Sequence, residues 1–272
     1  MYKFQGGTAL KIDLVSGVYF SPTGNTAKVV NAIGNRIAGD YYKEIDLTMP
    51  EARGQKRNFI ASELLIVGVP VYRGRIPEVM VQELKNFKGN QTPAIILVTY
   101  GNRVVEDALL ELKDIMIAQG FIPFGAGLFS GQHSFNKEIG YNRPDRKDIT
   151  MAEQFADEIV EKLKTLDRNK VGLVVAGDRP YKQVPPMSKM PFLPETDLRC
   201  IYCMICAQYC PMGAISMSNP KAIDTNKCVR CTKCIKVCPV QAKKMTPDTF
   251  GNFVKKITTP NVLYRKEPWF FV

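Results

Sequence analysis

All eight cysteines of this 272-residue chain lie in one short segment towards its C-terminal end. They form two sets with the same internal spacing, CIYCMICAQYCP and CVRCTKCIKVCP. A constant interval separates each cysteine of the first set from its counterpart in the second: the sets are Cys200, Cys203, Cys206 and Cys210, and Cys228, Cys231, Cys234 and Cys238. The chain therefore contains an internal duplication of a short unit that ends in cysteine and proline.

The spacing C-x2-C-x2-C-x3-C-P is that of bacterial iron–sulfur sites, in which the fourth cysteine ligates the other cluster. It predicts two [4Fe–4S] clusters, one held by Cys200, Cys203, Cys206 and Cys238. The second would be held by Cys228, Cys231, Cys234 and Cys210. Structural zinc, which favours two C-x2-C pairs across a longer gap, is a weaker alternative. Disulfides are also a weaker alternative. They need an oxidising compartment, and the N-terminus lacks an export signal.

The segment 197–245 resembles the two-cluster bacterial ferredoxins in all eight cysteines and in both prolines. The resemblance implies a small α+β ferredoxin-like domain.

The part of the chain before the cysteines, 1–166, alternates between two kinds of pattern. Apolar segments rich in β-branched residues predict strands, and segments with apolar residues near helical spacing predict helices. Strands are expected at 12–20, 41–47, 62–72, 92–100 and 121–130, the second being the weakest. Helices are expected at 26–39, 79–87, 104–120 and 150–166, the last capped by Thr150. This alternation predicts an α/β fold with a doubly wound, five-stranded parallel sheet.

The stretch SPTGNT falls at the turn from the first expected strand into the first helix. A helix N-terminus offers unpaired N–H groups and a partial positive charge. Hydroxyl and amide side chains and one glycine, which permits close backbone approach, surround it: Ser21, Thr23, Gly24, Asn25 and Thr26. The lysine of a nucleoside-triphosphate loop is missing. The stretch therefore predicts a site for a terminal phosphate, with a plain helix-capping turn as the alternative.

Residues 10–166 resemble flavodoxins, whose FMN phosphate loop typically reads [ST]-x-T-G-N-T. The resemblance implies that two later loops, 70–77 and 99–103, clasp the FMN ring. Tyr72 and Tyr100 are the candidates for stacking on the ring, with ordinary strand-end packing as the alternative. The other expected contacts are backbone groups of the two loops, at Arg73, Gly74, Gly101, Asn102 and Arg103.

Arg73 and Arg75 either offset charge near the flavin or are simply solvated. In many flavodoxins these loops are acidic, which keeps the potential of the reduced flavin very low. The two arginines here argue against a very low semiquinone/hydroquinone potential. The only histidine, His133, is a candidate proton donor or partner site, with a structural or solvated histidine as the stronger alternative. The spacing G-x-G-x-x-x-G at 125–131 only approaches a dinucleotide fingerprint, so no NAD site is predicted. No catalytic residue is assigned.

A proline-rich linker at 171–196 is expected to separate an FMN-binding domain at 1–170 from the iron–sulfur domain and its tail at 197–272. Such a linker is extended and semi-rigid. The tail, NVLYRKEPWFFV, is too apolar for a disordered segment and is expected to pack on a domain surface.

The formal net charge is +11, and the basic residues are dispersed, which argues against a nucleic-acid partner. Even with bound anionic cofactors the protein stays basic, so redox protein partners with acidic surfaces are expected. No apolar run is long enough for a membrane span, and the cytoplasm is the expected compartment. The sequence leaves open whether the protein forms a homodimer.

The whole chain resembles fused flavodoxin–ferredoxin proteins of anaerobic bacteria and archaea, an EFR-type ferredoxin family. The resemblance implies an electron-transfer protein that relays electrons between two [4Fe–4S] clusters and FMN, coupling one-electron protein carriers to one- or two-electron acceptors. The alternative is a flavin-dependent reductase of a small molecule such as a quinone, nitro compound or tetrapyrrole. A redox sensor is a third hypothesis. A buried pocket beside the flavin would favour the reductase, and an exposed ring edge the carrier.

Overall fold

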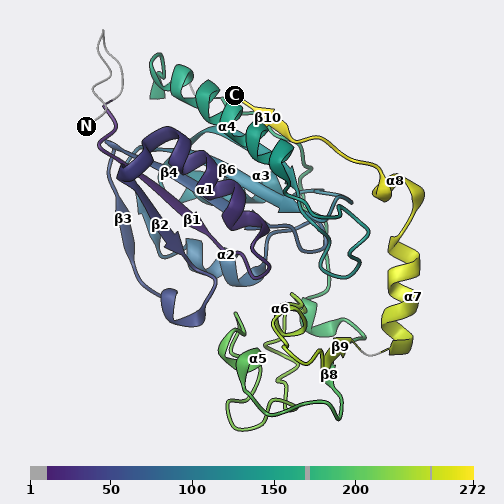
Figure 1. Ribbon diagram of the computed structural model, residues 1–272. Coiled ribbons are helices and arrows are strands. Elements are labelled where there is room, and N and C mark those ends of the chain that lie inside the picture. The colour runs from purple at the N-terminus through teal and green to yellow at the C-terminus, as the bar shows by residue number, and fades with distance from the viewer. Residues whose placement is uncertain (1–10, 169–171, 246) are drawn as a thin grey trace.

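The computed structural model describes residues 11–168, 172–245 and 247–272 (Figure 1). Its centre is a six-stranded sheet in the order β10-β7-β6-β4-β1-β2. Five strands are parallel: β1 Leu14–Tyr19, β2 Tyr42–Asp46, β4 Glu63–Pro70, β6 Thr92–Tyr100 and β7 Phe121–Ser130. Taken in chain order, these five have the spatial order 2-1-3-4-5, which is that of flavodoxin-like doubly wound sheets. The predicted fold class is therefore confirmed.

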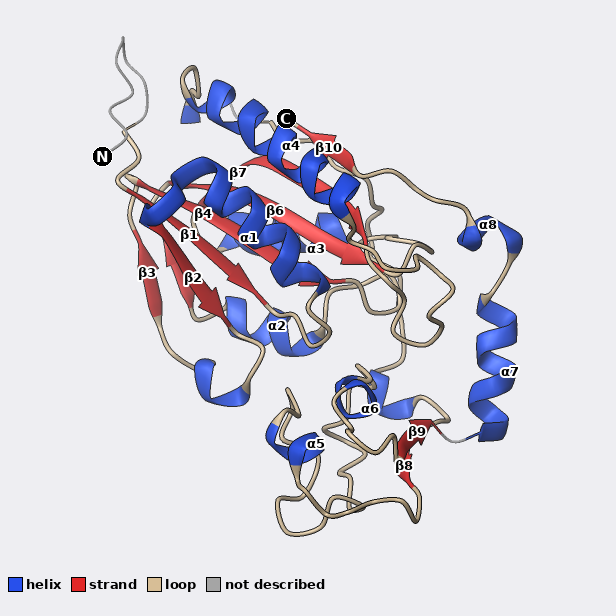
Figure 2. Cartoon of the chain, viewed as in Figure 1, coloured by secondary structure: helices blue, strands red, loops and turns tan. Residues whose placement is uncertain are grey.

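Helices cover both faces of the sheet (Figure 2). On one face, α1 (Asn25–Ala38) and α4 (Arg146–Leu163) share an apolar core with side chains of β1, β4, β6 and β7. On the other face, α2 (Glu78–Leu84) and α3 (Ala108–Ala118) enclose the second core. Because both faces are covered, the central strands are apolar at almost every position rather than alternating.

The structure differs from the sequence predictions at short or capped segments. α4 begins at Arg146, four residues before Thr150, because Asp145 and Asp148 form a reciprocal capping box there. Before the linker, two strands are absent from the predictions, β3 (Arg57–Phe59) and β5 (Phe87–Gly89), which pair in parallel. Such short segments carry too little periodicity to be recognised, and Phe87 belongs to β5 rather than to the helix expected at 79–87.

The linker is bonded to the first domain rather than free. The backbone N–H groups of Asp178 and Lys182 donate to the two carboxylate oxygens of Asp107, at 2.9 and 2.7 Å. Arg179 and Tyr181 contact Asp114 of α3. The short helix η4 (Met187–Lys189) then leads into the second unit. The predicted boundaries at 1, 170 and 171 lie outside the described residues, and the domain division stays a prediction.

The second unit repeats its own backbone. Strand β8 (Pro194–Thr196) pairs antiparallel with β9 (Lys243–Met245), and two one-turn helices, α5 (Ile205–Gln208) and α6 (Lys233–Lys236), occupy equivalent places in the two copies. Left-handed backbone recurs at equivalent positions, at Tyr202 and Arg230, Met204 and Thr232, and Gly213 and Gln241. The duplication in sequence is thus a duplication of conformation.

The C-terminal tail crosses back to the first domain. After α7 (Pro247–Ile257) and α8 (Pro260–Leu263), the strand β10 (Trp269–Phe271) pairs antiparallel with β7 and becomes the sixth strand of the sheet (Figure 1). Phe270 stacks on Phe155 of α4, with ring centroids 4.7 Å apart. The tail therefore packs on a domain surface, as expected, and extends the predicted five-stranded sheet to six. No helix among the described residues is long and apolar enough to cross a membrane.

Candidate cofactor sites

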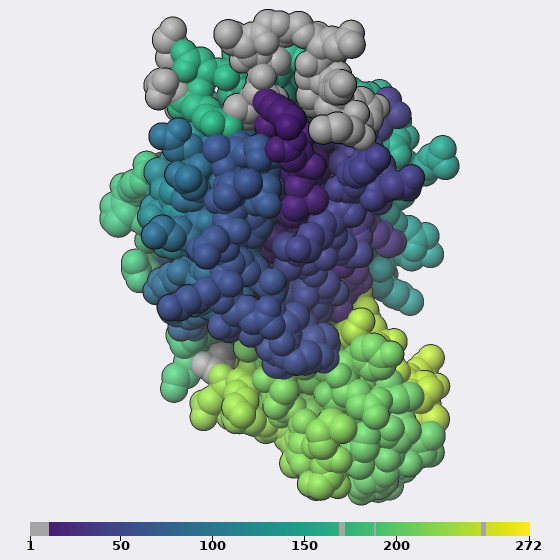
Figure 3. All heavy atoms as spheres, turned by 90° about the vertical axis from the view of Figure 1, so that its left-hand side faces the viewer, coloured from purple at the N-terminus to yellow at the C-terminus, as the bar shows by residue number. Residues whose placement is uncertain are grey.

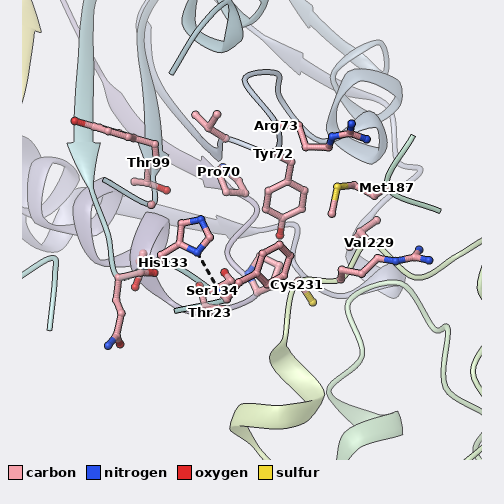
Figure 4. Close-up of a pocket in the computed structure, with 18 of the residues that line it drawn as sticks. Thr23, Pro70, Tyr72, Arg73, Thr99, His133, Ser134, Met187, Val229 and Cys231 are labelled. Carbon is pink, nitrogen blue, oxygen red and sulfur yellow. Dashed lines mark hydrogen bonds between the residues drawn. The ribbon is translucent and has the colours of Figure 1, made fainter. Parts of the chain in front are cut away.

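The second unit packs against the first domain (Figure 3), and a pocket lies there at the carboxyl ends of the parallel strands (Figure 4). The first domain contributes the loop after β1, the turn after β4, and the loops after β6 and β7. The linker adds Met187 and Met190, and the second unit adds Val229, Arg230, Cys231 and Phe253. Ligands of doubly wound sheets bind at this edge.

The loop into α1 leaves backbone donors for a ligand. Gly24 is the N-cap, with φ of 89° and no side-chain cap. The N–H of Ala27 donates to the hydroxyl of Ser21 at 3.0 Å. Within the described part of the chain, the N–H groups of Thr23, Asn25 and Thr26 have no hydrogen-bond acceptor. These three residues line the pocket at the positive end of α1, which fits a phosphate group.

The side chains of this loop mostly fasten it to its neighbours. The hydroxyls of Thr26 and Thr99 lie 2.6 Å apart, and the amide of Asn25 donates to the carbonyl of Gln132 at 3.1 Å. Ser21 also lines the pocket, and its hydroxyl keeps its own hydrogen for donation. Gly24 supplies the left-handed turn and is not itself part of the lining.

Tyr72 enters the pocket from a tight turn after β4. Its N–H and carbonyl both bond to Arg75, at 2.8 and 3.2 Å, and the two central residues, Arg73 and Gly74, have φ of 59° and 84°. This pattern is typical of a type I′ turn. A Cβ at Gly74 would fall 1.9 Å from the carboxylate of Glu106, so glycine is required there. Gly74 shapes the turn but does not line the pocket, whereas Tyr72 and Arg73 do.

Tyr72 lies between the pocket and the cysteine-rich unit (Figure 4). Burial raises the pKa of its hydroxyl well above the usual range, and the nearby thiols of Cys231 and Cys228 add to this rise. The phenol therefore stays neutral.

Of the loop after β6, Tyr100, Gly101 and Arg103 line the pocket, and Asn102 does not. The buried amide of Asn102 instead donates to the carbonyls of Val262 and Tyr264, at 2.8 and 2.7 Å. Its oxygen accepts from the hydroxyl of Ser130 at 2.9 Å. The side chain of Asn102 thus fastens the C-terminal tail, a role that the local sequence does not indicate.

His133 packs against Gly101, where a Cβ would fall 2.3 Å from the imidazole. Its Nδ1 accepts from the N–H of Phe135 at 3.1 Å, so the neutral ring carries its proton on Nε2. Burial lowers the pKa of His133 to about 4, and the charge of Arg103 contributes. The imidazole is neutral at pH 7 and lines the pocket as a hydrogen-bond donor (Figure 4).

The two arginines after β4 point in different directions. Arg73 lines the pocket and donates to the carbonyl of Pro185 in the linker. Arg75 is outside the lining and forms a bidentate pair with Glu111, at 2.9 and 2.6 Å. Two further arginines line the pocket, Arg103 and Arg230. Sequence reasoning missed Arg230, because only the docking of the two units brings it there.

Two smaller cavities in the second unit are each lined by four cysteines. The proximal cage is formed by Cys210, Cys228, Cys231 and Cys234. The distal cage is formed by Cys200, Cys203, Cys206 and Cys238. Each cage joins three cysteines of one copy to the fourth of the other, which is the grouping that the spacing predicts for cluster ligands.

The cages fit a cluster in their donor chemistry. The N–H groups of Ala214 and Ala242 donate to the sulfurs of Cys210 and Cys238, at 3.3 and 3.2 Å. In the proximal cage, the buried hydroxyl of Thr232 has no partner among the described residues. No three His, Cys, Asp or Glu side chains in the described ranges converge on one point as a single metal ion would require. The thiols instead surround a space, so their ligation of clusters remains a prediction.

Cys231 belongs both to the proximal cage and to the lining of the pocket. A cluster of phenylalanines holds the two units together beside it. The ring of Phe135 meets those of Phe192 in the linker and of Phe250 and Phe253 in α7, at centroid distances of 5.4, 5.7 and 5.9 Å. The pocket and the cage are thus adjacent within one chain.

Comparison with protein families matches residues 199–246 to the 4Fe-4S dicluster domain. The chain joins a flavodoxin-like domain to a ferredoxin-type domain. The family match indicates iron–sulfur clusters in the second part, and the strand order gives the first part its flavodoxin-like fold. None of the curated proteins matches the chain.

Solved structures similar to the first part include a flavodoxin from the domain Archaea (18% identity, 55% of this chain and 98% of that chain, TM-score 0.36). A flavodoxin from Streptococcus pneumoniae is similar too (18% identity, 55% of this chain and 99% of that chain, TM-score 0.40). Rubredoxin oxygen:oxidoreductase from Desulfovibrio gigas is also similar (16% identity, 57% of this chain and 37% of that chain, TM-score 0.42). Because these TM-scores are below 0.5, the fold assignment rests on the strand order instead.

Proposed function

We propose that the protein relays electrons between two [4Fe–4S] clusters, one in each cysteine cage, and FMN bound in the pocket between the domains. The observation that carries the proposal is the double position of Cys231, which lines both the proximal cage and the pocket. Electron transfer slows steeply with distance, so a ligand shared by the two sites favours direct transfer between their occupants.

The residues that would hold FMN come from the first domain. The free N–H groups of Thr23, Asn25 and Thr26 would bind its phosphate. Tyr72 and Tyr100 would cover its ring, and His133 would donate a hydrogen bond to it. When bound, FMN supplies a centre that accepts one or two electrons. The surrounding side chains would bind it, orient it and limit the access of water.

The distal cage is the side where a partner protein would exchange electrons. Cys203 is exposed, and apolar neighbours on its loop are exposed as well: Leu198, Ile201 and Tyr202. The ammonium of Lys221 lies 5.3 Å from the centre of the Tyr202 ring. Exposed basic residues next in the chain to members of the lining of this cage are Arg199, Lys221 and Lys244. An acidic one-electron carrier fits such a surface.

A second candidate function is reduction of a small molecule at the flavin. The observation that favours it is the cover over the pocket, formed by Met187, Met190, Arg230 and Phe253. This cover hinders a protein partner more than a small molecule. Turnover of a quinone or nitro compound by the cluster-reduced protein, faster than that of free FMN, would favour this reductase function.

The proposal is tested with anaerobically purified full-length protein. Acid extraction should release about one FMN and analysis should find about eight iron atoms per chain. After rapid mixing with a reduced protein carrier, cluster-to-flavin transfer should proceed at a rate that does not change on dilution. Release of FAD, a lack of flavin uptake, or a rate proportional to protein concentration would contradict the proposal.

A further inference from the structure

Three arginines from three segments line the pocket: Arg73 after β4, Arg103 after β6, and Arg230 in the second unit. Among the described residues that form this lining there is no Asp or Glu. The other titratable groups that line it are His133, Tyr72, Tyr100 and Cys231. The lining therefore carries a positive charge that no carboxylate within it offsets.

Two of these three arginines bond to neutral backbone carbonyls. Arg73 donates to the carbonyl of Pro185, and Arg230 donates to those of Phe192 and Met190, at 3.2 and 3.4 Å. The Nε of Arg103 is buried and has no acceptor among the described residues. Its charge is felt inside the pocket, because it contributes to the lowered pKa of His133. Fixed cations of this kind stabilise a negative charge that develops beside them.

We infer that these arginines bias the bound flavin towards its reduced, anionic form, so that electrons run from the proximal cage to the flavin. The inference rests on the proposed function. A low-potential one-electron protein carrier would supply the electrons through the cages. Two electrons, delivered one at a time, and one proton from water would convert the flavin into its reduced anion. Charge near the ring is a known means by which proteins tune flavin electronics.

The test is the equilibrium midpoint potential of the FMN in the anaerobic full-length protein, measured against reference dyes from mildly acidic to mildly alkaline pH. An anionic product takes up one proton per two electrons, so the potential should change with pH at half the slope of a two-proton reduction. Arg103→Gln should shift the equilibrium against reduction about tenfold or more, and Arg103→Lys should retain most of the wild-type value. Arg73→Gln should act in the same direction.

Arg36→Gln is the matched control, because Arg36 pairs with Asp157 on the exposed surface of α1 and α4, outside the pocket. It should leave the potential unchanged. A two-proton slope in the wild type, or equal potentials for wild type, Arg103→Gln and Arg73→Gln, would overturn the inference while leaving the relay intact. If Arg103→Gln fails to bind FMN, the inference is still tested by the potential of Arg73→Gln and by the pH slope of the wild-type potential. Failure of the wild type to bind FMN contradicts the proposed function instead.

Discussion

The two cysteine cages descend from one duplicated unit and lie in different surroundings. The proximal cage lies beside the first domain, with Cys231 half-buried at the pocket that Tyr72 also lines. The distal cage faces solvent at Cys203. Burial within a fold, rather than spacing within a motif, therefore gives two equivalent sites different neighbours and different access.

The cages also differ at several equivalent positions, and one of them is charged in the distal cage only. Ile215 lines the proximal cage, and its counterpart in the second copy, Lys243, lines the distal cage. Lys243 is 3% exposed, and its ammonium donates to the carbonyl of Pro220. A buried cation favours an added electron nearby, so a cluster in the distal cage is expected to have the higher potential of the two, apart from the effect of Arg230 on the proximal cage.

The largest expected effect tests whether the cages share their cysteines across the duplication. Cys210→Ala should remove or damage the cluster of the proximal cage and abolish rapid cluster-to-flavin transfer, because the sulfur of Cys210 lines that cage. Cys238→Ala is the matched variant and should damage the distal cluster. Electron paramagnetic resonance and iron analysis distinguish the two. Loss in Cys210→Ala of only the cluster held by Cys200, Cys203 and Cys206 would contradict this grouping.

The attachment of the C-terminal tail through Asn102 should contribute to the stability of the protein. Asn102→Ala removes a buried side chain that bonds to two tail carbonyls and to Ser130. The expected loss is about 2–4 kcal/mol in the free energy of unfolding, since several buried groups lose partners. Denaturant unfolding of the anaerobic protein measures it. Asn35→Ala, at an exposed position of α1, serves as the control, and an equal loss in both variants would argue against a special role for the tail contact.

Lys243→Met should bring the potentials of the two clusters closer together. Removing the buried ammonium is expected to shift the equilibrium of the distal cluster, whose cage Lys243 lines, about tenfold towards its oxidised form, with a smaller shift of the proximal cluster in the same direction. A potentiometric titration followed by electron paramagnetic resonance reports both. Lys244→Met removes a charge from the exposed neighbouring position and is the control. Equal shifts in the two variants would mean that burial of Lys243 has no special effect.

The smallest effect is expected at the surface of the distal cage. Lys221→Ala should slow reduction by an acidic protein carrier about two- to threefold at low salt, because a single rim charge changes mainly the association rate. The difference should shrink as salt is added. Lys255→Ala, on the exposed side of α7, is the control. A larger effect from Lys255→Ala would place the docking surface elsewhere.

The sequence predicted the elements that have a long, regular pattern. All five parallel strands and the first helix lie within a few residues of their expected positions. β3 and β5 were missed because such short segments show no period, and the start of α4 was missed because the capping box at Asp145 and Asp148 was not recognised. In the candidate site, the loop at 21–26 was found because it is contiguous. The backbone contact of Asn102 with the ring stays a prediction, and the bond of its side chain to the tail was not foreseen.

The sequence by itself determined the local features: the conformation repeated in the two copies of the cysteine unit, the thiol spacing, and the uncapped helix start that leaves N–H groups free. These depend on neighbours in the chain, whose identities and intervals are written in the sequence. Only the tertiary structure decided which cage adjoins the pocket, that Arg230 and Cys231 enter its lining, and that the tail completes the sheet. Such contacts join segments that lie far apart along the chain. Packing of the whole chain selects them, and no short pattern records them.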